Sequence, residues 1–231
     1  MLILAVDTAS PSGSIAVVRG EKVIGVLSTA SEESYSSRLF RHLEFLLSDL
    51  RLAYEAFDLF AVNSGPGSFT GLRVGLTAIK GWAEVYGKPA AAISGLEAVA
   101  AQSHSGPVIV PVLDARRGQV YFGFYRREQD ELVREGEERV ASPVEFLSAL
   151  RLRGDRSAAR VLSPDFDALG ELSSQLREEA VACERVAAVL APVIGRLAYH
   201  RARRGEVADA LTLDANYVRR SDAELNWKGP A

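Results

Sequence analysis

Cysteine, methionine, histidine and tryptophan are all scarce in this sequence. Its 231 residues include one Cys, one Met, three His and two Trp. A single cysteine, Cys183, cannot form a disulfide within the chain, which excludes the disulfide-stapled class of small domain. We expect Cys183 to be a core residue of an apolar helical run. No two of the three histidines stand at metal-ligand spacing, so the sequence predicts no zinc or iron site.

Long apolar runs and an excess of positive charge are missing as well. Gly, Pro or charged residues break every apolar run before it reaches membrane-spanning length, so no membrane contact is predicted. The opening run of residues 1–6 lacks a basic n-region, so we expect no signal peptide and a cytoplasmic protein. A net charge of −3 argues against binding nucleic acid by bulk electrostatics.

The apolar content of 48% is enough for one large or two small domains, and a repeated pattern favours two. An apolar strand over residues 2–6 ends at Asp7 and is followed by strands over residues 14–19 and 22–28. In the second half, residues 108–113 lead to Asp114 in the same way. The repeat predicts a duplicated, two-lobed α/β fold with a cleft between the lobes.

The polar, Gly/Pro-closed stretch at residues 101–107 is the expected lobe boundary. It divides the chain into a first lobe, residues 1–104, and a smaller, degenerate second lobe, residues 105–231. Within the second lobe we expect strands over residues 119–125 and 132–135. A helix at about residues 185–204 is expected to pack back on the first lobe.

A glycine-rich loop joins an apolar strand to a helix at residues 65–71, Gly-Pro-Gly-Ser-Phe-Thr-Gly. Backbone N–H groups at such a turn, together with the helix dipole, can hold a phosphate. The alternative is a tight strand-to-helix connection with nothing bound, and the sequence does not choose between them. The loop lacks the Gly-Lys-Ser/Thr of a Walker motif. The candidate phosphate contacts are Asp7, Thr8, Gly65, Gly67 and Ser68.

Asp7 and Asp114 both follow predicted strands, where open α/β sheets place their ligands. Each could hold Mg²⁺ through water, or it could accept hydrogen bonds from its own turn as Asp often does. For Asp114 we favour the turn.

Two predicted helices, residues 34–50 and 70–86, carry more apolar surface than one sheet needs to cover. Either both faces are buried within the chain, or one face meets another subunit. The candidate partner contacts are Tyr35, Leu39, Leu43, Leu46, Val74, Ala78 and Trp82.

Three segments resemble the TsaB (YeaZ) family, paralogues of TsaD within the actin, sugar-kinase and Hsp70-like ATPase fold. They are residues 3–8, the loop and helix start at residues 65–75, and Leu-Asp-Ala-Arg-Arg-Gly-Gln-Val-Tyr at residues 113–121. A tail at residues 217–219 is similar to the family's Tyr-Leu-Arg. Ala9 and Tyr35 stand where relatives often have Ser and His.

The resemblance implies a subunit of the machinery that makes N6-threonylcarbamoyladenosine in tRNAs reading ANN codons. It implies a TsaD homologue as partner, a TsaE-type ATPase as third subunit, a homodimer when alone, and only indirect contact with tRNA. TsaD carries a His-x-x-x-His metal motif where this chain has Gly95 and Val99. The Gly-Gly turn under the adenosine of catalytic members corresponds to residues 161–166, which hold no glycine.

The sequence thus favours a non-catalytic scaffold and activator with no metal and no certain cofactor. Weak ATP or ADP binding with Mg²⁺ at a shared interface stays open. The alternatives are a weak ATPase or phosphotransferase using Asp7 and the loop, and a glycoprotein peptidase, for which the chain shows no metal ligand or nucleophile.

Overall fold

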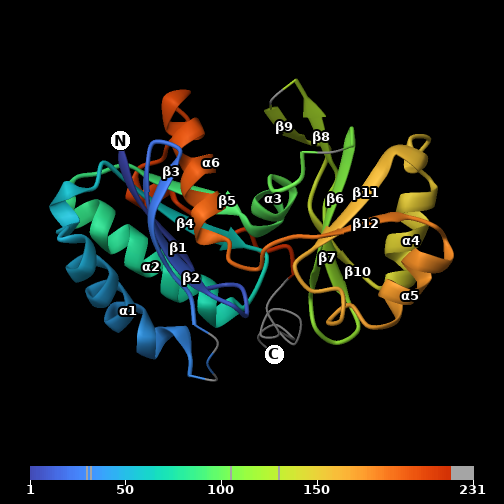
Figure 1. Cartoon of the computed structure of the whole chain (residues 1–231), viewed down its shortest axis with the longest axis horizontal. Coiled ribbons are helices and arrows are strands. Elements are labelled where there is room, and N and C mark those ends of the chain that lie inside the picture. Colours follow the sequence, from blue (N-terminus) through green and yellow to red (C-terminus); the bar gives the residue numbers. More distant parts are fainter. Residues whose placement is uncertain (30, 32, 105, 130, 220–231) are drawn as a thin grey trace, which may run out of the picture.

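The computed structural model describes residues 1–29, 31, 33–104, 106–129 and 131–219. It consists of two lobes side by side (Figure 1), each built on one mixed sheet. The first sheet has the strand order β3-β2-β1-β4-β5, and the core path of the second is β10-β7-β6-β11-β12.

In the first lobe, β1–β2 and β2–β3 pair antiparallel, whereas β1–β4 and β4–β5 pair parallel. Its elements are β1 (Leu2–Asp7), β2 (Ser14–Arg19), β3 (Lys22–Leu27), α1 (Tyr35–Leu50), the 3-10 turn Tyr54–Ala56, β4 (Leu59–Gly65), α2 (Phe69–Tyr86), β5 (Ala90–Ser94) and α3 (Gly95–Ala100).

The second lobe repeats this pairing, with β8 and β9 added as a hairpin that pairs with β6. Its elements are β6 (Val108–Asp114), β7 (Val120–Phe122), β8 (Tyr125–Glu128), β9 (Glu131–Arg134), β10 (Arg139–Ala141), α4 (Pro143–Arg151), the 3-10 turn Arg156–Ala158, β11 (Ala159–Ser163), α5 (Glu171–Glu178) and β12 (Ala182–Arg185). The chain then returns to the first lobe with α6 (Ala191–Arg203) and the 3-10 turn Ala210–Thr212. The same order and directions in both halves confirm the predicted duplication.

Local sequence explains the helix that follows the glycine-rich loop. Ser68 caps α2 by accepting a hydrogen bond from the Gly71 N–H, and Gly87, at φ 60°, ends the helix in the left-handed conformation that glycine adopts readily. Every residue of β1 is buried, because helices cover both faces of the first sheet.

The last helix of each half packs beyond its own sheet. α6 contacts β1, β2, β4 and β5 of the first lobe, and α3 contacts β6 and β11 of the second. One apolar cluster therefore runs from Ile3 and Ala5 through Ile194 to Ile109 and Leu162. The two sheets share a continuous core.

Two sequence expectations need correction. Cys183 lies on the edge strand β12 and is exposed, because this short segment pairs with β11 and is not helical. The single strand expected over residues 119–125 is divided into β7 and β8, which pair with different parts of β6.

Candidate functional site

The first candidate site lies where β1 and β4 end together. These strands are parallel neighbours with Val6 opposite Val62, so Asp7 comes to lie beside Asn63 and the glycine-rich loop. The Asp7 carboxylate is fully buried and accepts hydrogen bonds from Asn63 Nδ2 (2.9 Å), Ser10 Oγ (2.5 Å), Ala9 N (3.0 Å) and Ser10 N (3.2 Å). Four donors of the chain itself thus surround this acid.

The environment of Asp7 is dominated by desolvation. Burial raises the pKa of Asp7 above its ordinary value of 3.8, although hydrogen bonds from Ser10 and Asn63 offset part of this rise. A carboxylate that already accepts from four donors has little capacity left for the water shell of a Mg²⁺ ion. The geometry is that of an acid closing its own turn.

The glycines of the loop are explained by contacts within the chain. A Cβ on Gly67 would lie 2.6 Å from the Ala9 carbonyl oxygen, and one on Gly71 would lie 2.0 Å from the Thr8 carbonyl oxygen. One on Gly75 would lie 2.5 Å from Thr8 Oγ1. The turn after β1 therefore lies directly against the start of α2, so these positions require glycine whether or not an anion binds.

Hydrogen bonds hold the same two segments together. Thr8 Oγ1 donates to the Gly71 carbonyl oxygen (2.6 Å), and Ser68 N donates to the Ala9 carbonyl oxygen (2.9 Å). Within β4, Gly65 N donates to Asn63 Oδ1 (2.9 Å). The structure thus brings the predicted residues Asp7, Thr8, Gly65, Gly67 and Ser68 together. Nucleotide binding by them stays a prediction.

The turn after β6 also closes on itself. Asp114 Oδ1 accepts from Arg116 N (2.7 Å), and Ala115 N donates to the Gln119 carbonyl oxygen (2.9 Å). Arg116 and Arg117 both have positive φ, at 63° and 55°. Asp114 therefore acts as a turn acceptor, as the sequence favoured.

Metal chemistry finds no support among the described residues. No group of three or more His, Cys, Asp or Glu side chains in that part of the chain is placed to hold a metal ion. Gly95 and Val99 are both buried in α3, where they offer no ligand atoms.

Among the residues that the structure describes, no helix has the length and apolarity needed to cross a membrane.

A hollow of about 390 Å³ lies among α3, α6 and the β8–β9 hairpin. Its lining residues are Glu97, Tyr125, Leu132, Arg134, Arg201, Arg204 and Glu206. None of them belongs to the glycine-rich loop or to the turn after Asp7, so this hollow is separate from the predicted phosphate contacts.

The predicted partner contacts on α1 need correction. Tyr35, Leu39, Leu43 and Leu46 are all buried, with Leu39 and Leu43 fully so, in the cluster that joins α1 to the first sheet and to α2. Because the stripe on α1 is used to cover the sheet, these four side chains are not available to another subunit without unfolding the helix. The prediction for them is therefore wrong.

The α2 candidates lie differently. Val74, Ala78 and Trp82 are half-buried and follow one another at helical spacing of four residues. Phe40 of α1 is 60% exposed, and its ring packs edge-on against Trp82 with centroids 6.2 Å apart. We call Phe40, Val74, Ala78 and Trp82 the α1/α2 patch; three of its members were predicted, and Phe40 replaces the buried leucines.

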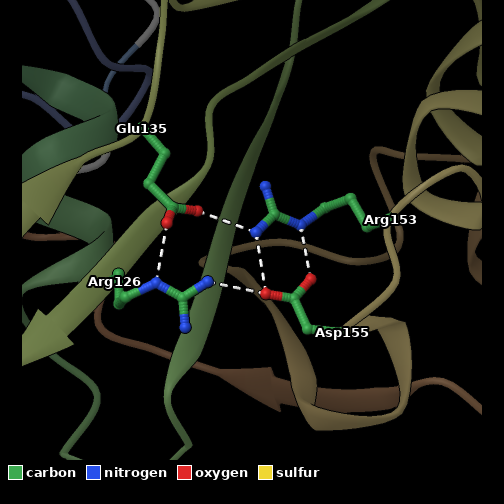
Figure 2. A network of polar contacts seen from close by, with 4 residues as sticks. All are labelled: Arg126, Glu135, Arg153 and Asp155. Atoms are coloured by element: carbon green, nitrogen blue, oxygen red, sulfur yellow. Dashed lines mark hydrogen bonds and ion pairs between the residues drawn. The ribbon is translucent and has the colours of Figure 1, made fainter.

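Two arginines of the second lobe form an ion-pair network with two acids (Figure 2). Arg126 bonds Glu135 (2.7 Å) and Asp155 (2.6 Å), and Arg153 bonds the same two acids at 2.8 and 2.9 Å. Hydrogen bonds from Arg153 and Arg126 lower the pKa of Asp155 to about 2. These guanidinium groups are committed to neighbouring acids.

Two polar residues at the site were missed. Asn63 had a visible signal, a polar side chain inside an otherwise apolar strand. Glu138 had none, since it stands in an acidic run of residues 135–138 between β9 and β10. In the structure it is buried and accepts from Ser94 Oγ and Tyr125 OH, both at 2.5 Å.

The comparison with known proteins gives the family. A family model described as tRNA N6-adenosine threonylcarbamoyltransferase (TsaD) matches residues 17–221. The tRNA threonylcarbamoyladenosine biosynthesis protein TsaB of Bacillus subtilis is 32% identical over 98% of this chain and 98% of its own. The chain belongs to the TsaB family. The TsaB of Haemophilus influenzae is 32% identical over 56% of each chain.

A solved TsaB-family structure shows the same fold. YeaZ from Pseudomonas aeruginosa superposes with a TM-score of 0.75, covering 94% of this chain and 99% of that chain at 22% identity. The similarity to this structure therefore extends over both lobes and not only over residues 3–8, 65–75 and 113–121.

Proposed function

We propose that this TsaB-family chain is a non-catalytic subunit of the machinery that forms N6-threonylcarbamoyladenosine in tRNA, where it binds and supports a TsaD homologue. One observation carries the proposal: the polar groups of the candidate site in the first lobe bond within the chain itself. Asp7 is fully buried and accepts four hydrogen bonds from donors of the chain itself, and the loop glycines pack on the turn after β1. Such a site gives an enzyme no open acid with which to orient a nucleophile.

The α1/α2 patch is the proposed contact surface for the TsaD homologue. It joins an exposed aromatic ring, Phe40, to the half-buried Trp82, and aromatic residues of this kind are frequent interface anchors. In the absence of that partner we propose that the same patch pairs with itself in a homodimer. A TsaE-type ATPase would join the complex as third subunit, and this chain would contact tRNA only indirectly.

The interface is tested with two matched substitutions on one helix. Phe40→Glu places a charge in the patch, whereas Phe45→Glu changes an equally exposed ring, 67% accessible, on another side of α1. A helix turns 100° per residue, so the two positions point about 140° apart. We expect Phe40→Glu to weaken binding to the TsaD homologue by roughly 30-fold or more, as the loss of an anchor residue does, and to dissociate the homodimer.

Sedimentation velocity of the purified variants, alone and mixed with the TsaD homologue, measures both effects. Phe45→Glu should sediment like the unchanged protein. The contact surface lies elsewhere if Phe40→Glu forms both complexes as well as the unchanged protein does and its circular dichroism spectrum is unchanged.

A further inference from the structure

The last described residues of the chain connect the two lobes. Asn216 N donates to the Ser64 carbonyl oxygen (2.7 Å) at the glycine-rich loop, and Arg219 Nη1 donates to the Ala115 carbonyl oxygen (2.9 Å) in the turn after β6. Arg219 Nη2 also donates to Gln119 Oε1 of that turn. The segment, residues 213–219, ends between the lobes (Figure 1).

This segment lies tightly against the loop of the first lobe. A Cβ on Gly65 would lie 2.8 Å from the Asn216 carbonyl oxygen, so the backbone of the segment covers Gly65 directly. The Tyr217 ring packs on Phe69 with centroids 5.3 Å apart, and the Arg73 guanidinium lies 4.0 Å from the Phe69 ring centre. An anion approaching Gly65 would meet this segment first.

Glu138 fixes the middle of the segment. Its carboxylate is buried and accepts from Ser94 of the first lobe, from Tyr125 of the second, and from Asn216 Nδ2. All three donors are neutral, and among the described residues no cationic group forms an ion pair with Glu138. Burial, followed by the proximity of Glu138, raises the pKa of Tyr125, so its hydroxyl stays a proton donor.

We propose that residues 213–219 act as a strap that ties the two lobes together and covers the glycine-rich loop, with Glu138 as the positioning residue that holds it. The strap is bonded to both lobes and to the Glu138 carboxylate. We therefore expect its contact with the glycine-rich loop and its contact with the turn after β6 to open together. Exposure of Gly65 to an anionic ligand then requires the strap to leave. The proposal does not depend on the partner assigned to the α1/α2 patch.

Amide hydrogen exchange, read by mass spectrometry on the whole chain, tests this coupling. Arg219→Ala removes only the bonds to the turn after β6, yet we expect the Asn216 N–H, which bonds the Ser64 carbonyl oxygen of the first lobe, to exchange about tenfold faster in peptides that contain it. Arg203→Ala, which removes an exposed arginine at the end of α6, should leave that exchange unchanged. Unchanged exchange at Asn216 in Arg219→Ala would overturn the strap.

The role of Glu138 is tested by removing its acceptor oxygens and by a conservative variant that keeps one. Glu138→Leu removes every acceptor from Asn216, Ser94 and Tyr125, so we expect the Asn216 N–H to exchange about tenfold faster. Glu138→Gln keeps an oxygen that can accept from Asn216 Nδ2 and should stay within about twofold of the unchanged protein. If Glu138→Leu exchanges as slowly as the unchanged protein, Glu138 does not hold the strap. Peptides from β1 and β6 report whether the core has stayed folded.

Discussion

Gly71→Ala is the sharpest probe of why the glycine-rich loop has its composition. The new methyl carbon would lie 2.0 Å from the Thr8 carbonyl oxygen, which is 1.4 Å short of the 3.4 Å at which ordinary contact begins. Because the obstacle is backbone, no rotamer change relieves it, and the start of α2 must move away from the turn after β1. Gly81→Ala is the matched control on the same helix, since a Cβ there meets nothing within 4 Å.

The expected destabilisation follows from what that movement breaks. Overpacking costs about 1–3 kcal/mol, and the bonds from Thr8 Oγ1 to Gly71 O and from Ser68 N to Ala9 O are worth about 1 kcal/mol each. Alanine regains about 1 kcal/mol of helix propensity over glycine. The net loss is about 2–4 kcal/mol for Gly71→Ala, whereas Gly81→Ala should gain about 1 kcal/mol.

Urea denaturation followed by circular dichroism measures both free energies of unfolding, and thermal melting gives a second readout. For a chain of this size, about 1 kcal/mol corresponds to about 2–4 °C, so the melting temperatures of the two variants should differ by roughly 10 °C or more. If Gly71→Ala is as stable as Gly81→Ala, the contact between the turn and α2 does not determine the loop sequence. Phosphate binding would then be the better explanation of the glycines in the loop.

Three further outcomes are expected. In the folded chain the pKa of Asp155 is about 2, below its ordinary value of 3.8. Between these pH values the unfolded chain binds more protons, so the free energy of unfolding rises with pH. Asp155→Asn should flatten that rise in acid denaturation curves. Calorimetry with Mg-ATP should show at most weak binding to the isolated chain, because the buried Asp7 already accepts from four donors of the chain; a low-micromolar site of one per chain would support the ATPase alternative. Filter binding should retain little tRNA at physiological salt, since Arg126 and Arg219 already bond within the chain; tight binding that is lost on their replacement by alanine would refute this.

Much of the fold could be predicted because its signals are local. Apolar strands that stop at Asp7 and Asp114 indicated the duplication, and the helix predicted over residues 70–86 agrees with α2 to within a residue. The apolar strand expected before the glycine-rich loop is β4. These features depend on short stretches whose chemistry permits few structures.

What could not be predicted depends on contacts between distant segments. Periodicity identified the apolar stripe of α1 but not what covers it, so Leu39 was assigned to an interface although it is core. The strap has no periodic pattern, and Arg219 reaches Ala115, which lies 104 residues away in sequence. The neighbouring Arg220 lies outside the described residues.

We propose that this chain supports a partner's reaction without performing one. The direct measurement is the amount of N6-threonylcarbamoyladenosine formed in tRNA by a TsaD homologue supplied with the threonylcarbamoyl adenylate, with and without this chain. We expect modification only when both proteins are present, and its loss with Phe40→Glu but not with Phe45→Glu. Modified tRNA produced by this chain in the absence of the TsaD homologue would contradict the claim.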